Sequence, residues 1–387
     1  MTPETLSPRA LLDRLVGFPT VSRDSNLALT GWLGTYLASH GIDLHEQRDP
    51  TGRKASVYAH VGPRDEGGVL LSGHTDVVPV DGQDWTSDPF TVVERDGRLF
   101  GRGTADMKGF DALAIWALVE ASKRDLKRPL QIALTRDEET GCFGAPVLIP
   151  EMLGVIPRAG VVIVGEPSSM QVVTGHKGSL GIDTHVRGVE VHSSLMHTGV
   201  SAVLEAAKIV NWANEVNAAN RAGEPGKLAA MFDPPWTTAH VGMIAGGTAH
   251  NITAKDCTFL FDFRNVPGEN TDDWKSGYHK VERGIEADMQ RVHPDAGITL
   301  SEAFDVPALA PETDGPAEAL ARELTGDNGS HVVSYGTEAG QFQREGFSVV
   351  VCGPGNIAQA HQPDEYITVD QFEAGHAFMR RLLDRLG

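Results

Sequence analysis

The chain has 387 residues, of which 41% are hydrophobic and 22% are charged, and it carries a formal net charge of −19. The length suits about two globular domains, and a chain this acidic repels a phosphate backbone, so we expect no nucleic-acid partner. No apolar run approaches the ~20 residues that cross a bilayer, and the first residues lack the pattern of a secretory signal, so we expect a cytoplasmic protein that does not bind membranes.

The first part of the chain alternates helices with buried strands. Its hydrophobic patterns predict helices at residues 4–18, with a Ser-Pro helix start inside, and at residues 26–41 and 109–124. Short runs of Val, Ile and Leu bounded by glycine predict strands that are buried on both faces, at residues 56–62, 67–74, 130–139 and 160–167. This alternation favours an α/β domain with a mixed or largely parallel sheet covered by helices.

The middle of the chain follows a different pattern. Residues 178–306 predict the order β-α-β-β-α-β, which is typical of a ferredoxin-like α+β unit. Residues 316–326 and 347–355 then return to the helix and strand patterns of the first part. We therefore predict a small domain of residues 180–303 inserted in a larger domain, which comprises residues 1–179 and 304–387.

Polar side chains follow the predicted buried strands, at the point where each strand ends. His74, Glu139 and Glu166 each come after such a run, His361 follows the last one, and Asp106 stands just before a helix. In open α/β sheets, ligands bind beyond the carboxyl ends of the strands, so we expect these five side chains to share one rim. Two histidines and three carboxylates suit a pair of zinc ions, although cobalt or manganese accepts the same donors.

Two further acidic residues have predicted roles beside this ligand set. Asp106 is the candidate for a carboxylate that bridges both ions, because glycines flank it and let the backbone approach closely. Asp76 could accept the second ring N–H of His74 and so fix its tautomer. Glu138, adjacent to Glu139, is the candidate general base that removes a proton from water. A protein that only binds metal has no need of this base, so the hypothesis of a non-catalytic metal-binding protein is weaker than that of a hydrolase.

The motifs that carry these residues resemble those of the zinc amidohydrolases that include acetylornithine deacetylase, succinyl-diaminopimelate desuccinylase, aminoacylase and glutamate carboxypeptidase. The resemblance implies a zinc-peptidase-like catalytic domain in which His74 and Glu166 bind one zinc, Glu139 and His361 bind the other, and Asp106 bridges them. It also implies a cis peptide bond between Asp106 and Met107. The matching segments are LLSGHTDVVPV, GRGTADMKGF, TRDEETGCFGA, VGEPSS, VHSSLMHTGVSA, GGTAHNI, DFR and AHQPDEY.

The same resemblance implies that the inserted domain is a lid through which two subunits form a homodimer. His192 would reach the partner subunit's site and stabilise the tetrahedral oxyanion. Asn251 and Arg264 correspond to positions that grip substrate, and Arg264 is the better candidate for holding a carboxylate. Three positions near His192 depart from the family pattern, namely Val191 in place of glycine, Met196 in place of proline and Ser201 in place of asparagine.

Within the family, the segments HKG, SYGTEAGQFQ and GPGNIAQAHQPDEY are most similar to the acetylornithine deacetylase branch. This similarity implies a substrate role for Lys177 and places Glu338 to attract a cationic side chain, although Glu338 could equally be a helix-start carboxylate. The function predicted is hydrolysis of N-acetyl-L-ornithine to ornithine and acetate in arginine biosynthesis. Deacylation of another N-acyl amino acid, desuccinylation and dipeptide hydrolysis remain alternatives, because specificity depends on pocket residues rather than on the metal ligands.

Overall fold

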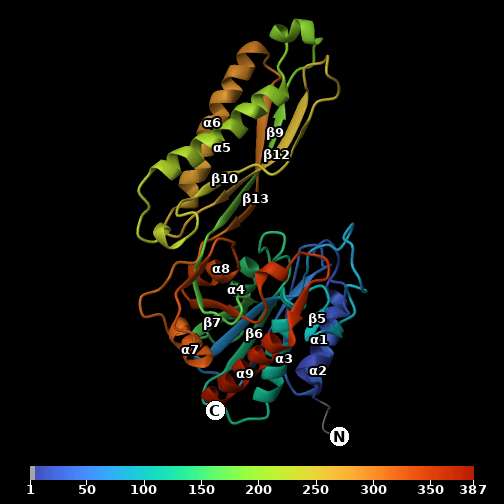
Figure 1. The fold of residues 1–387 in the computed structure, drawn as a ribbon, viewed down its shortest axis with the longest axis vertical. Coiled ribbons are helices and arrows are strands. Elements are labelled where there is room, and N and C mark those ends of the chain that lie inside the picture. The colour runs from blue at the N-terminus through green and yellow to red at the C-terminus, as the bar shows by residue number, and fades with distance from the viewer. Residues whose placement is uncertain (1–4) are drawn as a thin grey trace. The chain divides into compact units, whose positions relative to one another are not determined.

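The structure is a computed structural model that describes residues 5–387 (Figure 1). The chain divides into two compact units, each with its own sheet and its own hydrophobic core. The first unit comprises the residues up to 175 together with 311–331 and 337–387, and the second comprises residues 176–310 and 332–336. These limits lie a few residues outside the predicted insertion of residues 180–303.

The first unit is built on an eight-stranded mixed sheet with the strand order β1-β2-β6-β3-β7-β15-β8-β14, and the boundary between the units falls within the last strand, after His331. The four strands β6, β3, β7 and β15 are parallel neighbours, whereas β1, β2 and β8 pair in antiparallel fashion. The carboxyl ends of the four parallel strands therefore meet at one edge, and the predicted mixed α/β sheet is confirmed. The strand bounds are β1 Leu44–Arg48, β2 Ala55–Val61, β3 Val69–His74, β6 Leu130–Thr135, β7 Val161–Pro167, β8 Val173–His176, β14 His331–Val333 and β15 Ser348–Gly353.

Helices pack against this sheet and complete the first core. The predicted Ser-Pro start is confirmed in α1, where the Ser7 hydroxyl accepts a hydrogen bond from the Ala10 N–H and Pro8 takes the first helical position. Helix α3 is buried along most of its length and packs against α1 and α9. The helix bounds are α1 Pro8–Val16, α2 Leu27–Ser39, α3 Lys108–Ala121, α4 Ala145–Leu153, α7 Pro316–Thr325, α8 Ala339–Arg344 and α9 Val369–Leu386, with a 3-10 turn η3 at Ile357–Gln359.

A small three-stranded sheet in the first unit joins two segments that are far apart in the sequence. Its order is β16-β5-β4, with β4 at Val93–Arg95, β5 at Arg98–Phe100 and β16 at Tyr366–Thr368. Strand β16 pairs with β5 in antiparallel register, Tyr366 opposite Phe100. The segment that follows His361 is thereby attached to the segment that precedes Asp106.

The second unit has the predicted order of elements around an antiparallel sheet, β10-β12-β9-β13, with β11 also paired to β12. The first of the two adjacent strands in the predicted order is split into β10 and β11, because the chain carries one more residue here than the facing segment of β12, which is a β-bulge. An aromatic cluster that includes Trp212, Phe261 and Tyr278 fills the core. The element bounds are β9 Ser179–Arg187, η1 Ser193–Thr198, α5 Ala202–Ala222, η2 Ala229–Met231, β10 Thr238–His240, β11 Ile244–Gly246, β12 Asp256–Arg264, α6 Thr271–Val292 and β13 Gly297–Val306.

Among residues 5–387, none of the helices combines the length and the apolar character needed to cross a bilayer.

Candidate metal centre

The first unit gathers the five predicted ligands at the carboxyl edge of its parallel strands. His74 is the last residue of β3, Glu139 follows β6, and Glu166 lies near the end of β7. His361 follows β15 and η3, and Asp106 stands two residues before α3. His74, Asp106 and Glu166 are buried, Glu139 is partly buried, and His361 is exposed. Neighbouring strands of one sheet and the start of one helix thus bring together residues that span nearly 300 positions of the sequence.

Asp106 lies between the two histidines. Its Oδ1 is 3.1 Å from His74 Nε2, and its Oδ2 is 3.2 Å from His361 Nε2. A carboxylate with one oxygen toward each histidine is arranged to bridge two cations. The surrounding backbone is closely packed, since a Cβ on Gly109 would lie 2.3 Å from the Thr104 carbonyl oxygen, and the Asp106–Met107 peptide is cis, as the family resemblance implies.

The two glutamates complete opposite sides of this arrangement. Glu166 Oε1 lies 3.8 Å from His74 Nε2, and Glu139 Oε2 lies 3.0 Å from His361 Nε2. His74 and Glu166 therefore form one half of the cluster and His361 and Glu139 form the other, with Asp106 between them. These pairs match the two ligand sets implied by the family resemblance.

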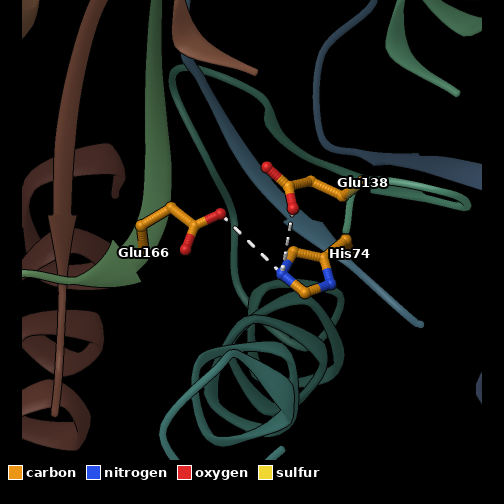
Figure 2. A group of neighbouring side chains, drawn as sticks. All are labelled: His74, Glu138 and Glu166. Carbon is orange, nitrogen blue, oxygen red and sulfur yellow. Dashed lines mark ion pairs between the residues drawn. The ribbon is translucent and has the colours of Figure 1, made fainter. Parts of the chain in front are cut away.

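Glu138 also faces the cluster. Its Oε2 lies 3.9 Å from His74 Nε2, and Figure 2 shows that the carboxylates of Glu138 and Glu166 point from different elements toward the same ring nitrogen. Close donor groups occur in two sets of three, His74 with Glu138 and Glu166, and His74 with Asp106 and Glu139. Distance alone thus does not distinguish a general base from a ligand at position 138. The other oxygen of Glu138, Oε1, accepts a hydrogen bond from the Cys142 thiol at 3.2 Å.

The buried carboxylates give the site a strong negative charge that fits divalent cations. Burial and the charge of Asp106 raise the pKa of Glu139 to about 8 and raise that of Glu166 well above its usual range. Burial likewise raises the pKa of Glu138. Glu139 Oε1 is buried and has no hydrogen-bond partner among the described residues. Such groups are stable in their charged form only when a cation offsets the repulsion, so the nitrogen and oxygen donors present here fit a metal pair.

The same carboxylates raise the pKa values of the two histidines. Burial alone would lower the pKa of His74, but its hydrogen bond to Asp106 and the charges of Glu138 and Glu166 raise it well above the usual value. Hydrogen bonds to Asp106 and Glu139 raise the pKa of His361 to about 10. Metal binding requires both imidazoles to lose a proton, so metal binding should release protons and weaken as the pH falls.

Asp76 supports the cluster in a different way from the one predicted. The Nδ1–H of His74 donates to the main-chain carbonyl of Asp76 at 2.9 Å, whereas the Asp76 carboxylate lies 3.8 Å from that nitrogen. The carboxylate instead accepts hydrogen bonds from the main-chain N–H of Glu138 at 3.1 Å and from the Ser22 hydroxyl at 2.7 Å. The tautomer of His74 is thus fixed by backbone, and the side chain of Asp76 holds the loop that carries Glu138.

Glu338 is buried next to the cluster, and its side chain is not accessible from the surface. It is 1% exposed, accepts a hydrogen bond from the Thr135 hydroxyl, and lies 3.5 Å from the Ser72 hydroxyl. It occupies the N-cap position of α8 without a side-chain capping bond. Burial and the charge of Glu138 raise its pKa well above the usual range. Contact with a cationic substrate group, as predicted, would require this carboxyl to be uncovered.

The remaining predicted substrate residues lie in the second unit. His192 is exposed, and its Nδ1 accepts hydrogen bonds from the main chain and hydroxyl of Ser194, which leaves Nε2 to carry the proton. The main-chain carbonyl of Asn251 accepts a bond from Ser193 N–H at 2.8 Å. Arg264 pairs with Asp262 at 3.0 Å while its side chain stays 40% exposed.

Lys177 has a structural environment that the sequence did not predict. It is 1% exposed, and its ammonium donates to the carbonyls of Pro234 and Trp236 at 2.8 and 2.9 Å. A substrate contact by Lys177 would have to replace these hydrogen bonds.

Glu365 is a site residue that the sequence reasoning did not single out. Its Oε1 accepts hydrogen bonds from the main-chain N–H groups of Ala105 and Asp106 at 2.9 and 3.1 Å. The available signal was the acidic residue in the AHQPDEY segment, only four positions after His361. The contact of Glu365 with the main chain at Asp106 could not be recognised from the sequence, because it depends on the pairing of β16 with β5.

Comparisons with known proteins identify the family of the chain. A family model described as Peptidase family M20/M25/M40 matches residues 70–385. Acetylornithine deacetylase from Myxococcus xanthus is 33% identical over 385 residues, 96% of each chain, and that from Proteus mirabilis is 34% identical, covering 97% of this chain and 95% of the relative.

Solved structures share the fold at lower sequence identity. A tripeptidase from Staphylococcus aureus superimposes with a TM-score of 0.74 at 18% identity and covers 99% of both chains. An M20 family metallo-carboxypeptidase from Sulfolobus solfataricus gives the same TM-score at 18% identity and covers 98% of both chains.

Proposed function

The chain belongs to peptidase family M20/M25/M40, and on that premise we propose that it hydrolyses N-acetyl-L-ornithine to L-ornithine and acetate in a cytoplasmic arginine-biosynthesis pathway. The observation that carries the hydrolytic part is the arrangement of Asp106 between two histidines, with Glu138 beside the cluster. The choice of acyl group and amino acid is supported by the names of the full-length relatives.

We assign two zinc ions to the cluster. His74 and Glu166 would hold one ion, His361 and Glu139 the other, and Asp106 would bridge them, since the structure pairs the side chains in this way. Cobalt or manganese would suit the same nitrogen and oxygen donors. When bound, the ions supply Lewis acidity that polarises the scissile carbonyl and makes water a stronger nucleophile at neutral pH.

Glu138 is assigned as the general base. The raised pKa of its buried carboxyl suits a group that accepts a proton from the attacking water and returns it to the departing amine nitrogen. The Asp76 carboxylate keeps the loop in place through the Glu138 N–H. The carbonyl carbon thereby gains the water oxygen, the C–N bond breaks, and acetate and the free amine leave.

The second unit would supply the substrate contacts. The Nε2–H of His192 is free to donate to the oxyanion of the tetrahedral intermediate, and the partly exposed guanidinium of Arg264 can hold the substrate carboxylate. We assign Asn251 to the same site. In a homodimer His192 would act at the partner subunit's centre, and the exposed Leu195, Met196 and Leu204 nearby are the apolar surface such an assembly would cover.

A substrate panel measured together with metal content tests this assignment. The purified protein is assayed against N-acetyl derivatives of ornithine, other amino acids, N-succinyl-diaminopimelate and dipeptides, and its zinc, cobalt and manganese contents are determined. We expect two metal equivalents per chain and the highest kcat/KM for N-acetylornithine. If N-acetylornithine ranks among the poorest substrates, the assignment is wrong and the best compound in the panel replaces it.

A further inference from the structure

Glu365 and Arg102 form a fully buried ion pair behind the metal centre. Both side chains are 1% exposed, and Arg102 Nη1 donates to Glu365 Oε2 at 2.7 Å. The second oxygen of Glu365 accepts the N–H groups of Ala105 and Asp106. The carboxylate therefore holds the backbone of the bridging ligand on one side and a guanidinium on the other.

The guanidinium of Arg102 extends this network to a second ligand. Its Nη2 donates to Gln83 Oε1 at 2.6 Å, and the amide Nε2 of Gln83 donates to the main-chain carbonyl of His361 at 3.0 Å. Trp85 also donates its indole N–H to Gln83 Oε1 at 3.1 Å, and its ring lies 5.1 Å from the guanidinium carbon. A continuous path of hydrogen bonds thus joins the backbones of Asp106 and His361.

We propose that Gln83, Arg102 and Glu365 are positioning residues that set the distance between Asp106 and His361 and so determine how tightly the ion between them is held. This inference rests on the proposed function, because it assumes that these two side chains bind metal. None of the three side chains need touch the substrate or the ions. They act through the backbone of the two ligands.

The energetics of the pair support a positioning role rather than a purely stabilising one. Desolvating a guanidinium and a carboxylate offsets much of their attraction, and buried ion pairs are often no more stable than apolar residues of similar size. Glu365 accepts hydrogen bonds from two main-chain N–H groups. These bonds fix the backbone at Asp106 in a way that a pair of apolar side chains could not.

The need for such a link follows from the local backbone at His361. Its φ is +63°, in the left-handed region that is unfavourable for most residues other than glycine, and its side chain is 51% exposed. Asp106, by contrast, is held in a buried loop at the start of α3. Without a cross-link, the ligand on the exposed segment would have the greater freedom.

The test is a Co2+ titration of the metal-free protein, followed by calorimetry and by visible absorption, which reports the geometry of the ligands. Gln83→Leu removes both functions of the amide, whereas Gln83→Glu keeps an acceptor for Arg102 and Trp85 but loses the donor to His361. Gln362→Leu is the matched control, because that exposed glutamine donates to the Ala358 carbonyl instead. Glu365→Gln is examined as a second site, with the unfolding temperature of each metal-free variant as a check on folding.

We expect the wild type to bind two equivalents of Co2+. Both Gln83 variants should bind one of them about tenfold more weakly, with an altered absorption spectrum and a metal-free unfolding temperature close to that of the wild type. Glu365→Gln should show a loss at least as large, and Gln362→Leu should match the wild type.

Three results distinguish the inference from the proposed function. Unchanged affinity and spectrum in both Gln83 variants, with two ions bound, would overturn the positioning network and leave the proposed function standing. A loss of affinity that merely follows a lower metal-free unfolding temperature would overturn it as well. A wild-type protein that binds no Co2+ would instead contradict the proposed function itself.

Discussion

At the scale of single residues, Glu138 and Glu139 show how adjacent side chains of one chemical type take different environments. Glu139 contacts His361, whereas Glu138 contacts the Cys142 thiol and faces His74. Because consecutive side chains point in different directions, one loop presents two carboxylates to two parts of the site. The assignment of base and ligand can therefore be separated by mutation.

Glu138→Ala should leave both metal ions bound and lower kcat by about 10²–10⁴-fold, the usual contribution of a general base. Metal content by atomic absorption and kcat on the best substrate are the measurements. Glu139→Ala is the comparison variant, and we expect it to lose metal affinity as well as activity. Near-normal turnover in Glu138→Ala, or loss of an ion from it, would show that Glu138 is not the base.

His176 makes a separate prediction about pH. It is fully buried, its Nδ1–H donates to the Lys177 carbonyl, its Nε2 has no partner among the described residues, and burial lowers its pKa to about 4. The unfolded value is about 6.5. As the pH falls from 6.5 toward 4, only the unfolded chain gains this proton, so the folded state loses stability in that window.

Replacing this imidazole with a side chain that does not titrate should remove part of that pH sensitivity. Between pH 7.5 and pH 5, the decrease in the free energy of unfolding should be about 2 kcal/mol smaller in His176→Gln than in the wild type. Urea unfolding at the two pH values measures it. Because the metal centre titrates alike in both proteins, an equal decrease in both would rule out a neutral buried imidazole.

The clustering of the five proposed ligands could be predicted at the residue scale because each of them follows its own strand or precedes a helix. The supporting contacts could not. Whether His74 bonds to the carbonyl or to the carboxylate of Asp76 depends on the local backbone, and the sequence pattern favoured the wrong group. The link from Glu365 to Arg102 spans 263 positions and arises only when β16 pairs with β5.

At the scale of elements, the start of α3 is where close packing and metal binding meet. Gly109 is its second residue, and an added Cβ would lie 2.3 Å from the Thr104 carbonyl oxygen in the loop that carries Asp106. Gly109→Ala should destabilise the protein by about 1–3 kcal/mol and also weaken metal binding, because the loop must move.

Gly31→Ala is a matched control for that change. Gly31 lies inside α2, and an added Cβ would meet no atom within 4 Å, so alanine should stabilise the protein by about 0.5–1 kcal/mol. Thermal unfolding and metal titration of both variants provide the comparison. If Gly109→Ala proves as stable as Gly31→Ala, the close approach of Thr104 is relieved by a small shift and does not constrain the site.

Most long elements with clear hydrophobic patterns were predicted, although helix α9 was not, and the short elements were not. The buried strands β2, β3, β6, β7 and β15 and the helix α3 lie where their patterns place them, and α5 and α6 take the two helix positions in the order predicted for the second unit. The three-residue strands β4, β5 and β16 have no pattern long enough to detect, since their pairing depends on distant partners. The bulge that separates β10 from β11 depends on register against β12, which is a property of two strands rather than one.

At the scale of the whole molecule, the division into two units limits which part of the fold bound metal stabilises. The donors of the cluster all come from the first unit, and the second unit has its own core around Phe261 and Tyr278. A ligand that binds only the folded state stabilises it by about 4 kcal/mol at a thousandfold excess over its Kd, and this stabilisation acts where the ligand binds.

Metal removal should therefore loosen the first unit selectively. After EDTA treatment at pH 7, the buried carboxylates lose the cations that offset their repulsion, and amide hydrogen exchange should rise in residues 74–76, 104–108 and 136–142. Exchange in β9, β12 and β13 should stay unchanged, and added Zn2+ should restore the protection. Hydrogen-exchange mass spectrometry of both forms measures this difference. A comparable rise across both units would mean that they unfold as one cooperative body, so that the metal pair stabilises the second sheet as much as the first.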